Sequence, residues 1–149
     1  MTLKEELDKV AQATKEDKEF VSKFLSNKGA FSCFKRGGVK FWYVPKICVD
    51  FSVRHIDEME KLARIFDTKL LKLPKYPSQR IYTPQVKVVI TGRKAFAWMK
   101  FLMLEWCQDK DLAVRANKIG KVIRKVRDYD RKMFKYMYID DYGDAQEKS

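Results

Sequence analysis

The residues with the most reactive side chains are few and lie far apart along the chain. There are three cysteines, Cys33, Cys48 and Cys107, and one histidine, His55. Their spacing contains no CxxC pair and no Cys/His cluster, which argues against a zinc site. The sequence also lacks a Ser-His-Asp arrangement, a pair of carboxylates and a phosphate-binding glycine loop. We expect buried, reduced thiols in an intracellular protein, with the cytoplasm and an organelle matrix both open.

Charge is the strongest signal of the whole sequence. Lysine and arginine number 32 against 20 aspartates and glutamates, for a net charge of +12 in 149 residues. A positive field favours polyanions, nucleic acid first and an acidic membrane surface second. No apolar run approaches the roughly 18 residues that span a bilayer, and no signal peptide opens the chain. We therefore expect a nucleic-acid partner and no membrane; a merely solubilising surface is the alternative.

Two short helices are expected first, at 2–13 and 15–27. Thr2 and Thr14 stand where N-cap residues are preferred, each with an acid three residues later. Gly29 ends the second helix, whose apolar residues gather on one side. The segment from Leu3 to Gly29 therefore predicts a helical pair that leads directly into the next element.

A long β-hairpin follows. The segment AFSCFKR (30–36) leads through Gly37-Gly38, a two-residue hairpin signal, into VKFWYVPKICVDFSV (39–53). The second strand alternates over its whole length, with one apolar face and one mixed and basic face. Such a pattern predicts a sheet with helices on its back and water on its front. Pro45 is expected to mark a bend or bulge, because it cannot donate to a ladder.

The rest of the chain repeats this plan. The expected elements are a helix at 56–66, strands at 68–73 and 80–91, an apolar helix at 93–107 and a long helix after Asp109. The outer face of the last helix carries Arg115 and other basic residues, as a solvated face or an auxiliary phosphate contact. The order α-α-β-β-α-β-β-α-α predicts one α+β domain at 1–149, with its core at 15–127, an N-terminal helix at 1–14 and an extension at 128–149. The acidic, aromatic tail from Tyr138 is expected to be loosely held.

The front of the predicted sheet is the candidate functional surface. From the alternation it carries Ser32, Phe34, Arg36, Lys40, Trp42, Lys46, Ser52, Arg54, Lys69, Arg80, Thr83, Gln85 and Lys87. A β-ribbon with such side chains can reach base edges in a major groove, while its lysines and arginines neutralise phosphates. Phe34 and Trp42 suit unpaired bases better, which keeps structured RNA open beside duplex DNA. The alternatives are an ordinary solvated face or one covered by a partner. His55, at the strand-to-helix corner, is interpreted as a capping or packing residue.

This order of elements resembles the core unit of the LAGLIDADG homing endonuclease family, over residues 15–127. The segments that carry the resemblance are FVSKFLSNKGAF (20–31), WYVPKICVDFSVRHIDEMEKLARIF (42–66) and YTPQVKVVITGRKAFAWMKFL (82–102). The resemblance implies two hairpins that form one curved antiparallel sheet, backed by helices. It also implies a nucleic-acid partner.

Aligned by Gly29, the family's nine-residue motif falls on VSKFLSNKG (21–29). The resemblance then puts the metal-binding acid at Lys28 and the second acid at Ser26. A charged ammonium repels a divalent cation and has no lone pair to offer, although it could contact a phosphate. We therefore predict no catalytic residue and no metal, with Lys28 as a nucleic-acid contact and Mg²⁺ required only if the protein cleaves after all.

In the family, small residues on this helix let two copies pack closely, but here that position falls on Lys23. A looser homodimer, a monomer and a hetero-complex through helix 15–27 stay open, because a buried ammonium would be costly in a tight seam. The predicted function is nucleic-acid binding without cleavage. The alternatives are a structural RNA-binding subunit of a ribonucleoprotein such as a ribosome, an active homing endonuclease or intron maturase, and a protein-interaction module with incidental charge.

Overall fold

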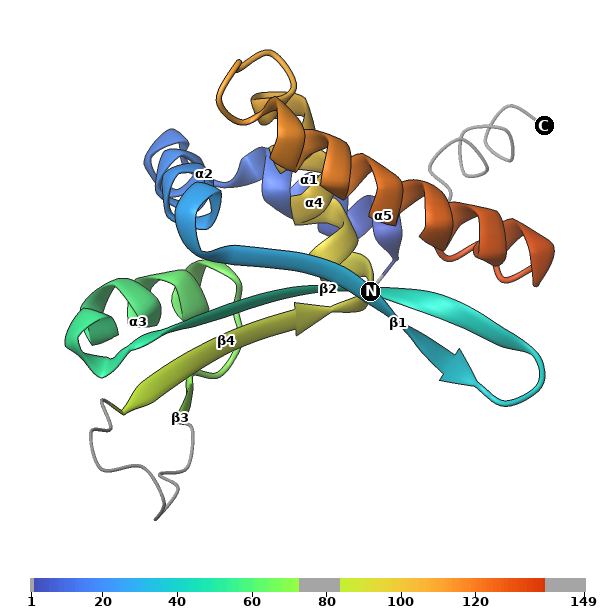
Figure 1. Cartoon of the computed structure of the whole chain (residues 1–149), viewed down its shortest axis with the longest axis horizontal. Coiled ribbons are helices and arrows are strands. Elements are labelled where there is room, and N and C mark those ends of the chain that lie inside the picture. The colour runs from blue at the N-terminus through green and yellow to red at the C-terminus, as the bar shows by residue number, and fades with distance from the viewer. Residues whose placement is uncertain (1, 73–83, 139–149) are drawn as a thin grey trace.

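The computed structural model describes residues 2–72 and 84–138 of the chain. The elements are α1 (Leu3–Gln12), α2 (Lys15–Lys28), β1 (Gly29–Gly37), β2 (Phe41–Ser52), a short 3-10 helix η1 (Val53–His55), α3 (Ile56–Ile65), β3 (Leu71–Lys72), β4 (Gln85–Thr91), α4 (Gly92–Trp106) and α5 (Ala113–Lys132). This order confirms the predicted α+β class. Figure 1 shows α2, α4 and α5 on one side of the strands.

The four strands form one antiparallel sheet in the order β1-β2-β4-β3. The two hairpins therefore join along their inner strands, where Val49 of β2 lies opposite Val88 of β4. β4 pairs with β2 from Lys46 to Ser52. Residues 41–45 of β2 have no strand partner on that side among the described residues. Trp42 and Val44 of this unpaired edge line one hollow with Met137 and Tyr138 of the C-terminal segment.

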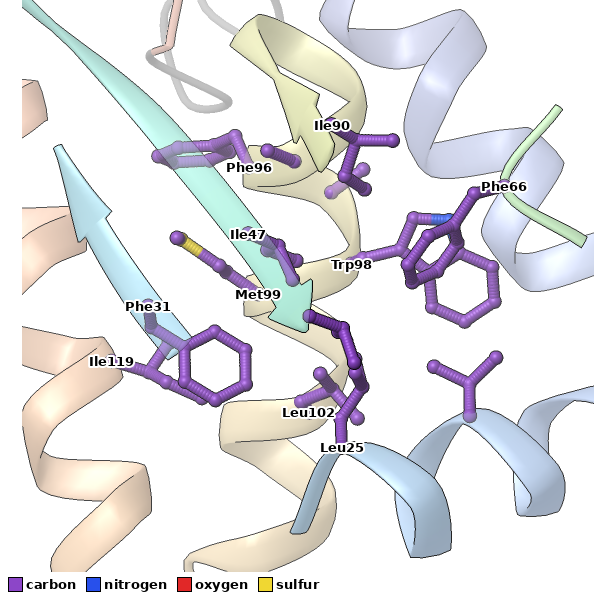
Figure 2. Close-up of a cluster of buried hydrophobic side chains, with 14 of the residues drawn as sticks. Leu25, Phe31, Ile47, Phe66, Ile90, Phe96, Trp98, Met99, Leu102 and Ile119 are labelled. Carbon is purple, nitrogen blue, oxygen red and sulfur yellow. The ribbon is translucent and has the colours of Figure 1, made fainter. Parts of the chain in front are cut away.

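One face of the sheet is the floor of the hydrophobic core. Ile47 and Val49 of β2 and Val88 and Ile90 of β4 all point to this face and are buried. Figure 2 shows Ile47 and Ile90 among side chains of α4, including Met99. Full burial of one such side chain stabilises the fold by about 1.5–3 kcal/mol. The odd-numbered face of β2 is therefore the back of the sheet, as the alternation predicts.

The N-terminal helices begin where the sequence predicts. The hydroxyl of Thr2 accepts a hydrogen bond from the Glu5 amide over 3.1 Å, and that of Thr14 accepts one from the Asp17 amide over 3.1 Å. Each cap satisfies a backbone donor that the helix itself leaves unpaired, which is worth about 1 kcal/mol. Both predicted caps are confirmed.

Gly29 joins α2 to β1 without an intervening loop. Its φ of −76° is accessible to any residue, so its role is steric. A Cβ atom at this position would lie 2.9 Å from the carbonyl oxygen of Leu25, too close for any side chain without a shift. The glycine thus lets the first strand start directly against the end of α2.

The first hairpin differs from the prediction at its tip. Gly37 pairs with Phe41, so three residues, 38–40, form the loop instead of the predicted Gly37-Gly38 pair. Gly37 has a φ of +101°, and a Cβ there would meet the Lys40 carbonyl oxygen at 2.6 Å. Lys40 consequently lies in the loop and outside the strand. The register continues through Pro45 without interruption, so the expected bulge is absent from this hairpin.

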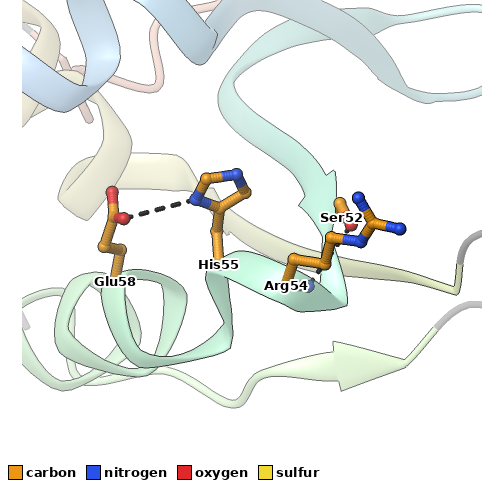
Figure 3. A network of polar contacts seen from close by, with 4 residues as sticks. All are labelled: Ser52, Arg54, His55 and Glu58. Carbon is orange, nitrogen blue, oxygen red and sulfur yellow. Dashed lines mark hydrogen bonds and ion pairs between the residues drawn. The ribbon is translucent and has the colours of Figure 1, made fainter.

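The far end of β2 also differs. The strand was predicted to run to residue 53, with Arg54 on its front, but it ends at Ser52. The hydroxyl of Ser52 accepts a hydrogen bond from the Arg54 amide over 3.3 Å and starts η1 (Figure 3). This local cap turns the backbone away from the ladder. Arg54 therefore lies at the rim of the sheet.

The second hairpin is shorter on one side than predicted. β3 contains only Leu71 and Lys72, so Lys69 lies before the strand and not on it. Arg80 and Thr83 lie outside the described residues. At the other end of the chain, Tyr138 is buried, so this first residue of the tail is not loosely held as expected; residues 139–149 lie outside the described residues. In the described ranges, no helix has the length and apolar character needed to cross a membrane.

Candidate nucleic-acid interface

The two hairpins present one continuous surface opposite the core, which we call the front face. The ladder places Ala30 opposite Cys48, and Cys48 opposite Val89, so every second residue of β1, β2 and β4 shares this side. On these three strands its members are Ala30, Ser32, Phe34, Arg36, Trp42, Val44, Lys46, Cys48, Asp50, Ser52, Gln85, Lys87, Val89 and Thr91. Leu71 of β3, opposite Lys87, shares this side. The predicted residues of the strands thus come together as expected.

The centre of the front face is basic and polar. Lys46 and Lys87 are half-buried there, and Arg36 is exposed towards the tip of the first hairpin. Asp50 is the one acid among the front-face residues, and it lies opposite Lys87 in the ladder. Opposite charges at such a cross-strand position attract one another. The remaining cationic groups leave the described part of this face with a net positive charge.

Cys48 lies in the middle of this surface. Burial raises the pKa of its thiol, and the neighbouring Asp50 carboxylate raises it further, against the opposing effect of Lys87 and Lys46. The thiol is therefore protonated at neutral pH, and its sulfur lies 4.0 Å from an Asp50 carboxylate oxygen. A protonated, half-buried thiol is a poor nucleophile, so Cys48 contributes surface and not chemistry.

One end of the front face is aromatic. The guanidinium of Arg36 lies 5.7 Å from the ring centre of Phe34, and the ammonium of Lys135 lies 5.1 Å from that of Trp42. A hollow of about 400 Å³ is lined here by Arg36, Trp42, Val44, Thr91, Gly92, Arg93, Met137 and Tyr138, with Glu6 and Lys94. The sequence analysis missed this contribution of the C-terminal segment.

Lys28 lies away from the front face. It is the last residue of α2, and its ammonium lies 4.4 Å from the ring centre of Phe51, a residue of the back face. Both residues line a hollow of about 410 Å³ together with Phe20, Lys23, Phe24, Asn27 and Glu58. The structure thus separates Lys28 from the other predicted nucleic-acid contacts.

The predicted motif positions do not fit a divalent cation. Lys28 offers an ammonium, and the Ser26 hydroxyl donates to the Lys23 carbonyl oxygen of its own helix over 2.6 Å. The one carboxylate that lines the hollow around Lys28 belongs to Glu58, which lies 3.3 Å from the His55 imidazole (Figure 3). Ca²⁺ and Mg²⁺ need several oxygen ligands. Within 2–72 and 84–138 there is no cluster of three or more His, Cys, Asp or Glu residues.

His55 performs the packing role that the sequence suggested. Its ring lies 3.9 Å from the ring centre of Phe51, at the corner between β2 and α3. It occupies the N-cap position of α3, where its side chain makes no capping hydrogen bond. In Figure 3 the Arg54 side chain points away from the His55–Glu58 pair. The rim at this end of the front face therefore carries Arg54.

Arg115 was predicted on the solvated side of the last helix, and the structure corrects this. Its guanidinium donates to the carbonyl oxygens of Leu25, over 3.2 Å, and Gly29, at the junction of α2 and β1. It also lies 5.6 Å from the ring centre of Phe31. Burial lowers the pKa of Arg115 from its ordinary high value, and the group stays charged at neutral pH. α5 thus fixes the position of the first hairpin.

No protein-family model and no curated protein matches the sequence. Among solved structures, the homing endonuclease I-TnaI matches with a TM-score of 0.51 and 13% identity, over 70% of this chain and 69% of that chain. The group I intron-encoded homing endonuclease I-CeuI, complexed with DNA, matches with a TM-score of 0.49 and 12% identity, over 80% and 58%. The LAGLIDADG meganuclease I-CpaMI, bound to uncleaved DNA, matches with a TM-score of 0.49 and 12% identity, over 78% and 40%. The protein has the LAGLIDADG homing endonuclease fold.

Proposed function

We propose that the protein binds nucleic acid through the front face of its sheet and does not cleave it. The observation that carries this proposal is the shared surface of the two hairpins, basic and polar on the front while the back is buried in the core. A positive net charge of +12 adds a long-range attraction for polyanions. The fold of I-TnaI supports the proposal as an analogy of fold.

The mechanism follows from the alternation of the strands. Arg36, Lys46 and Lys87 are positioned to neutralise phosphates, which provides affinity without sequence information. Ser32, Ser52, Gln85 and Thr91 lie on the same side of the sheet and offer hydrogen-bonding groups. A β-ribbon of this kind reads base edges where it enters a groove. Lys40, Arg54 and Lys69 lie outside the strands and add charge around this surface.

The absence of cleavage is proposed from the chemistry at the end of α2. The family resemblance puts the metal-binding acid at residue 28, where this chain has a lysine. Its ammonium lies over the Phe51 ring, and a cation near it would be repelled. Ser26 carries a hydroxyl, which is bonded to its own helix, so neither motif position supplies a carboxylate. The active endonuclease and maturase alternatives would need a metal held elsewhere.

Charge reversal on the front face tests the binding proposal. We expect the double variant Lys46→Glu/Lys87→Glu to lose affinity for both duplex DNA and structured RNA. The slope of the logarithm of its binding constant against the logarithm of the salt concentration should also decrease in magnitude by about one for each phosphate contact removed. The matched control is Lys118→Glu/Lys121→Glu, which makes the same charge change at two exposed positions of α5. Equal losses in the two variants, or none in either, would refute a specific role of the front face.

A structural RNA-binding subunit of a ribonucleoprotein is the second candidate. It is favoured by the aromatic end of the front face, where Phe34 and Trp42 are half-buried and accessible beside cationic groups. Bases in a duplex are already stacked on their neighbours and offer no free face to such rings, whereas unpaired bases stack on them. Competition between a structured RNA and duplex DNA of equal length distinguishes the two. Co-sedimentation with a large particle would support the subunit hypothesis.

A further inference from the structure

The chain turns sharply after α5 and returns beside the edge of β2 that has no strand partner in the described part of the sheet. We call residues 133–138 the C-terminal turn. Within it, Phe134 has a φ of +54° and Tyr136 a φ of +53°, both in the left-handed region. This conformation is unfavourable for bulky aromatic residues, so the surrounding structure must hold it in place.

Asp130 supplies that support. Its side chain is 1% exposed, and its two carboxylate oxygens accept hydrogen bonds from the amides of Met137, over 3.1 Å, and Tyr138, over 2.8 Å. Its carbonyl oxygen accepts a third from the amide of Lys135, over 3.1 Å. A carboxylate buried at this depth is tolerated because it is hydrogen-bonded. Its carboxylate thus fixes the end of the turn, and backbone hydrogen bonds from the amide of Phe134 to the Arg131 carbonyl oxygen, over 3.1 Å, and from that of Lys135 fix its beginning.

The end of the turn is anchored as firmly. The Tyr138 ring is 4% exposed and lies 5.5 Å from the ring centre of Phe96 on α4. The guanidinium of Arg127 donates to the Tyr138 carbonyl oxygen over 3.2 Å. The C-terminal turn is therefore a defined element of the fold, joined to α4 and α5.

This rigid turn displays aromatic surface to solvent. Phe134 is 75% exposed, and its ring lies 6.2 Å from that of Tyr136 in an edge-to-face arrangement. Neither the strain at Phe134 nor the exposure of its ring improves the core. The left-handed residue after the C-cap of a helix is usually glycine, and here the backbone bonds of Phe134 and Lys135 end α5 in this common way. A phenylalanine in that place, with its ring exposed to water, provides apolar surface for a ligand.

The charge around the turn indicates what that ligand is. Lys135, between the two aromatic residues, lies over the Trp42 ring of the front face at 5.1 Å. Arg36 lines one hollow with Met137 and Tyr138 of the turn. Aromatic rings on a positively charged surface are the usual platform for unpaired bases, whose phosphates the cations neutralise. A fully paired duplex offers no free base face to such a ring.

We propose that the C-terminal turn is a base-stacking element, in which the Phe134 ring stacks on an unpaired base of RNA bound to the aromatic end of the front face. The inference rests on the proposed function and specifies its ligand class. The backbone hydrogen bonds at the end of α5 hold the Phe134 ring where a base can reach it. Lys135 and Arg36 contact the phosphates on either side of that base.

The test uses the full-length chain and two labelled RNA probes, a blunt duplex and the same duplex with a single-stranded tail. Phe134→Gly removes the ring and also relieves the left-handed strain. We expect this variant to melt at the same or a higher temperature, yet to bind the tailed probe roughly 5- to 150-fold more weakly. Its affinity for the blunt duplex should not change. Phe134→Trp should keep the preference for the tail.

Val114→Ala is the control, because Val114 is a comparably exposed apolar side chain elsewhere, 77% exposed on α5. If Phe134→Gly binds the tailed probe as well as the wild-type protein does, the inference is wrong, and a protein partner for the turn becomes the next hypothesis. Different results would refute the proposed function: the wild-type protein would bind neither probe, or charge reversal of Lys46 and Lys87 would have no effect on binding. A loss of the tail preference confined to Phe134→Gly supports the inference.

Discussion

The indole nitrogen of Trp106 donates a hydrogen bond to the hydroxyl of Ser22 over 2.9 Å, joining the end of α4 to the middle of α2. Trp106 is 1% exposed, and its ring also meets that of Phe31 edge to face at 5.7 Å. Together with the contacts of Arg115, this bond sets the position of α2 relative to the sheet. The end of α2 carries Lys28, so the same contacts place the residue on which the proposed absence of cleavage depends.

Ser22→Ala should destabilise the fold by about 1–3 kcal/mol, because it leaves a buried indole N–H without a partner. The measurement is the free energy of unfolding in urea. Ser26→Ala serves as the matched control, since the Ser26 hydroxyl bonds only to a carbonyl of its own helix in the described structure. A similar small loss in both variants would contradict a structural role for the Trp106–Ser22 bond.

Binding on the front face should protect Cys48 from alkylation. Cys48 lies between Lys46 and Asp50 on that face, whereas Cys107 is exposed at the end of α4. Because burial raises the pKa of Cys48, iodoacetamide should modify it more slowly than Cys107 at neutral pH. Added nucleic acid should slow Cys48 further, several-fold, and leave Cys107 as an internal control. Mass spectrometry of the labelled peptides measures both rates; equal protection would place the ligand elsewhere or show general shielding.

Mg²⁺ should neither stabilise the wild-type protein nor support strand cleavage by it, because Lys28 repels the cation. Lys28→Glu adds a second carboxylate to the hollow that Glu58 lines, and its melting temperature should rise with Mg²⁺. Lys15→Glu is the comparison variant, with the same charge change at an exposed position of α2 that does not line this hollow. Nicking of DNA by the wild-type chain that a chelator abolishes would overturn the proposed absence of cleavage.

Tyr138 should make stability depend on alkaline pH. Burial raises its pKa above the ordinary value of about 10, so the folded state holds the phenol proton more tightly than the unfolded chain does. Its contribution is fully present below pH 10 and is lost as the pH rises through the raised pKa. The difference in unfolding free energy between wild-type protein and Tyr138→Phe, measured from pH 8 to 11, should change in that direction. A constant difference would mean that the phenol has the same pKa in the folded and unfolded states.

Patterns of short range determined much of the architecture in advance. Thr2 and Thr14 cap their helices with groups three residues away, and the alternation of β2 assigns Ile47 to the core and Lys46 to the front. Such features are readable because a cap needs one turn of helix and a strand has a period of two. The order of elements and the two faces of each strand follow from them, whereas the joining of the two hairpins into one sheet was expected from the family resemblance.

Contacts between distant segments were decided only in the tertiary structure. Arg115 lies 90 positions from Leu25 in the sequence. Because it is charged, it was expected to face solvent, but its guanidinium donates to the backbone at the end of α2. The ammonium of Lys28 rests on Phe51, and Asp130 draws the C-terminal turn against α4 and the edge of β2. The position of a charged residue in the sequence does not reveal which group it will contact, because that contact depends on how the helices pack on the sheet. The sequence by itself determined which strand residues share the front face, and the packing decided which charges and rings lie beside it.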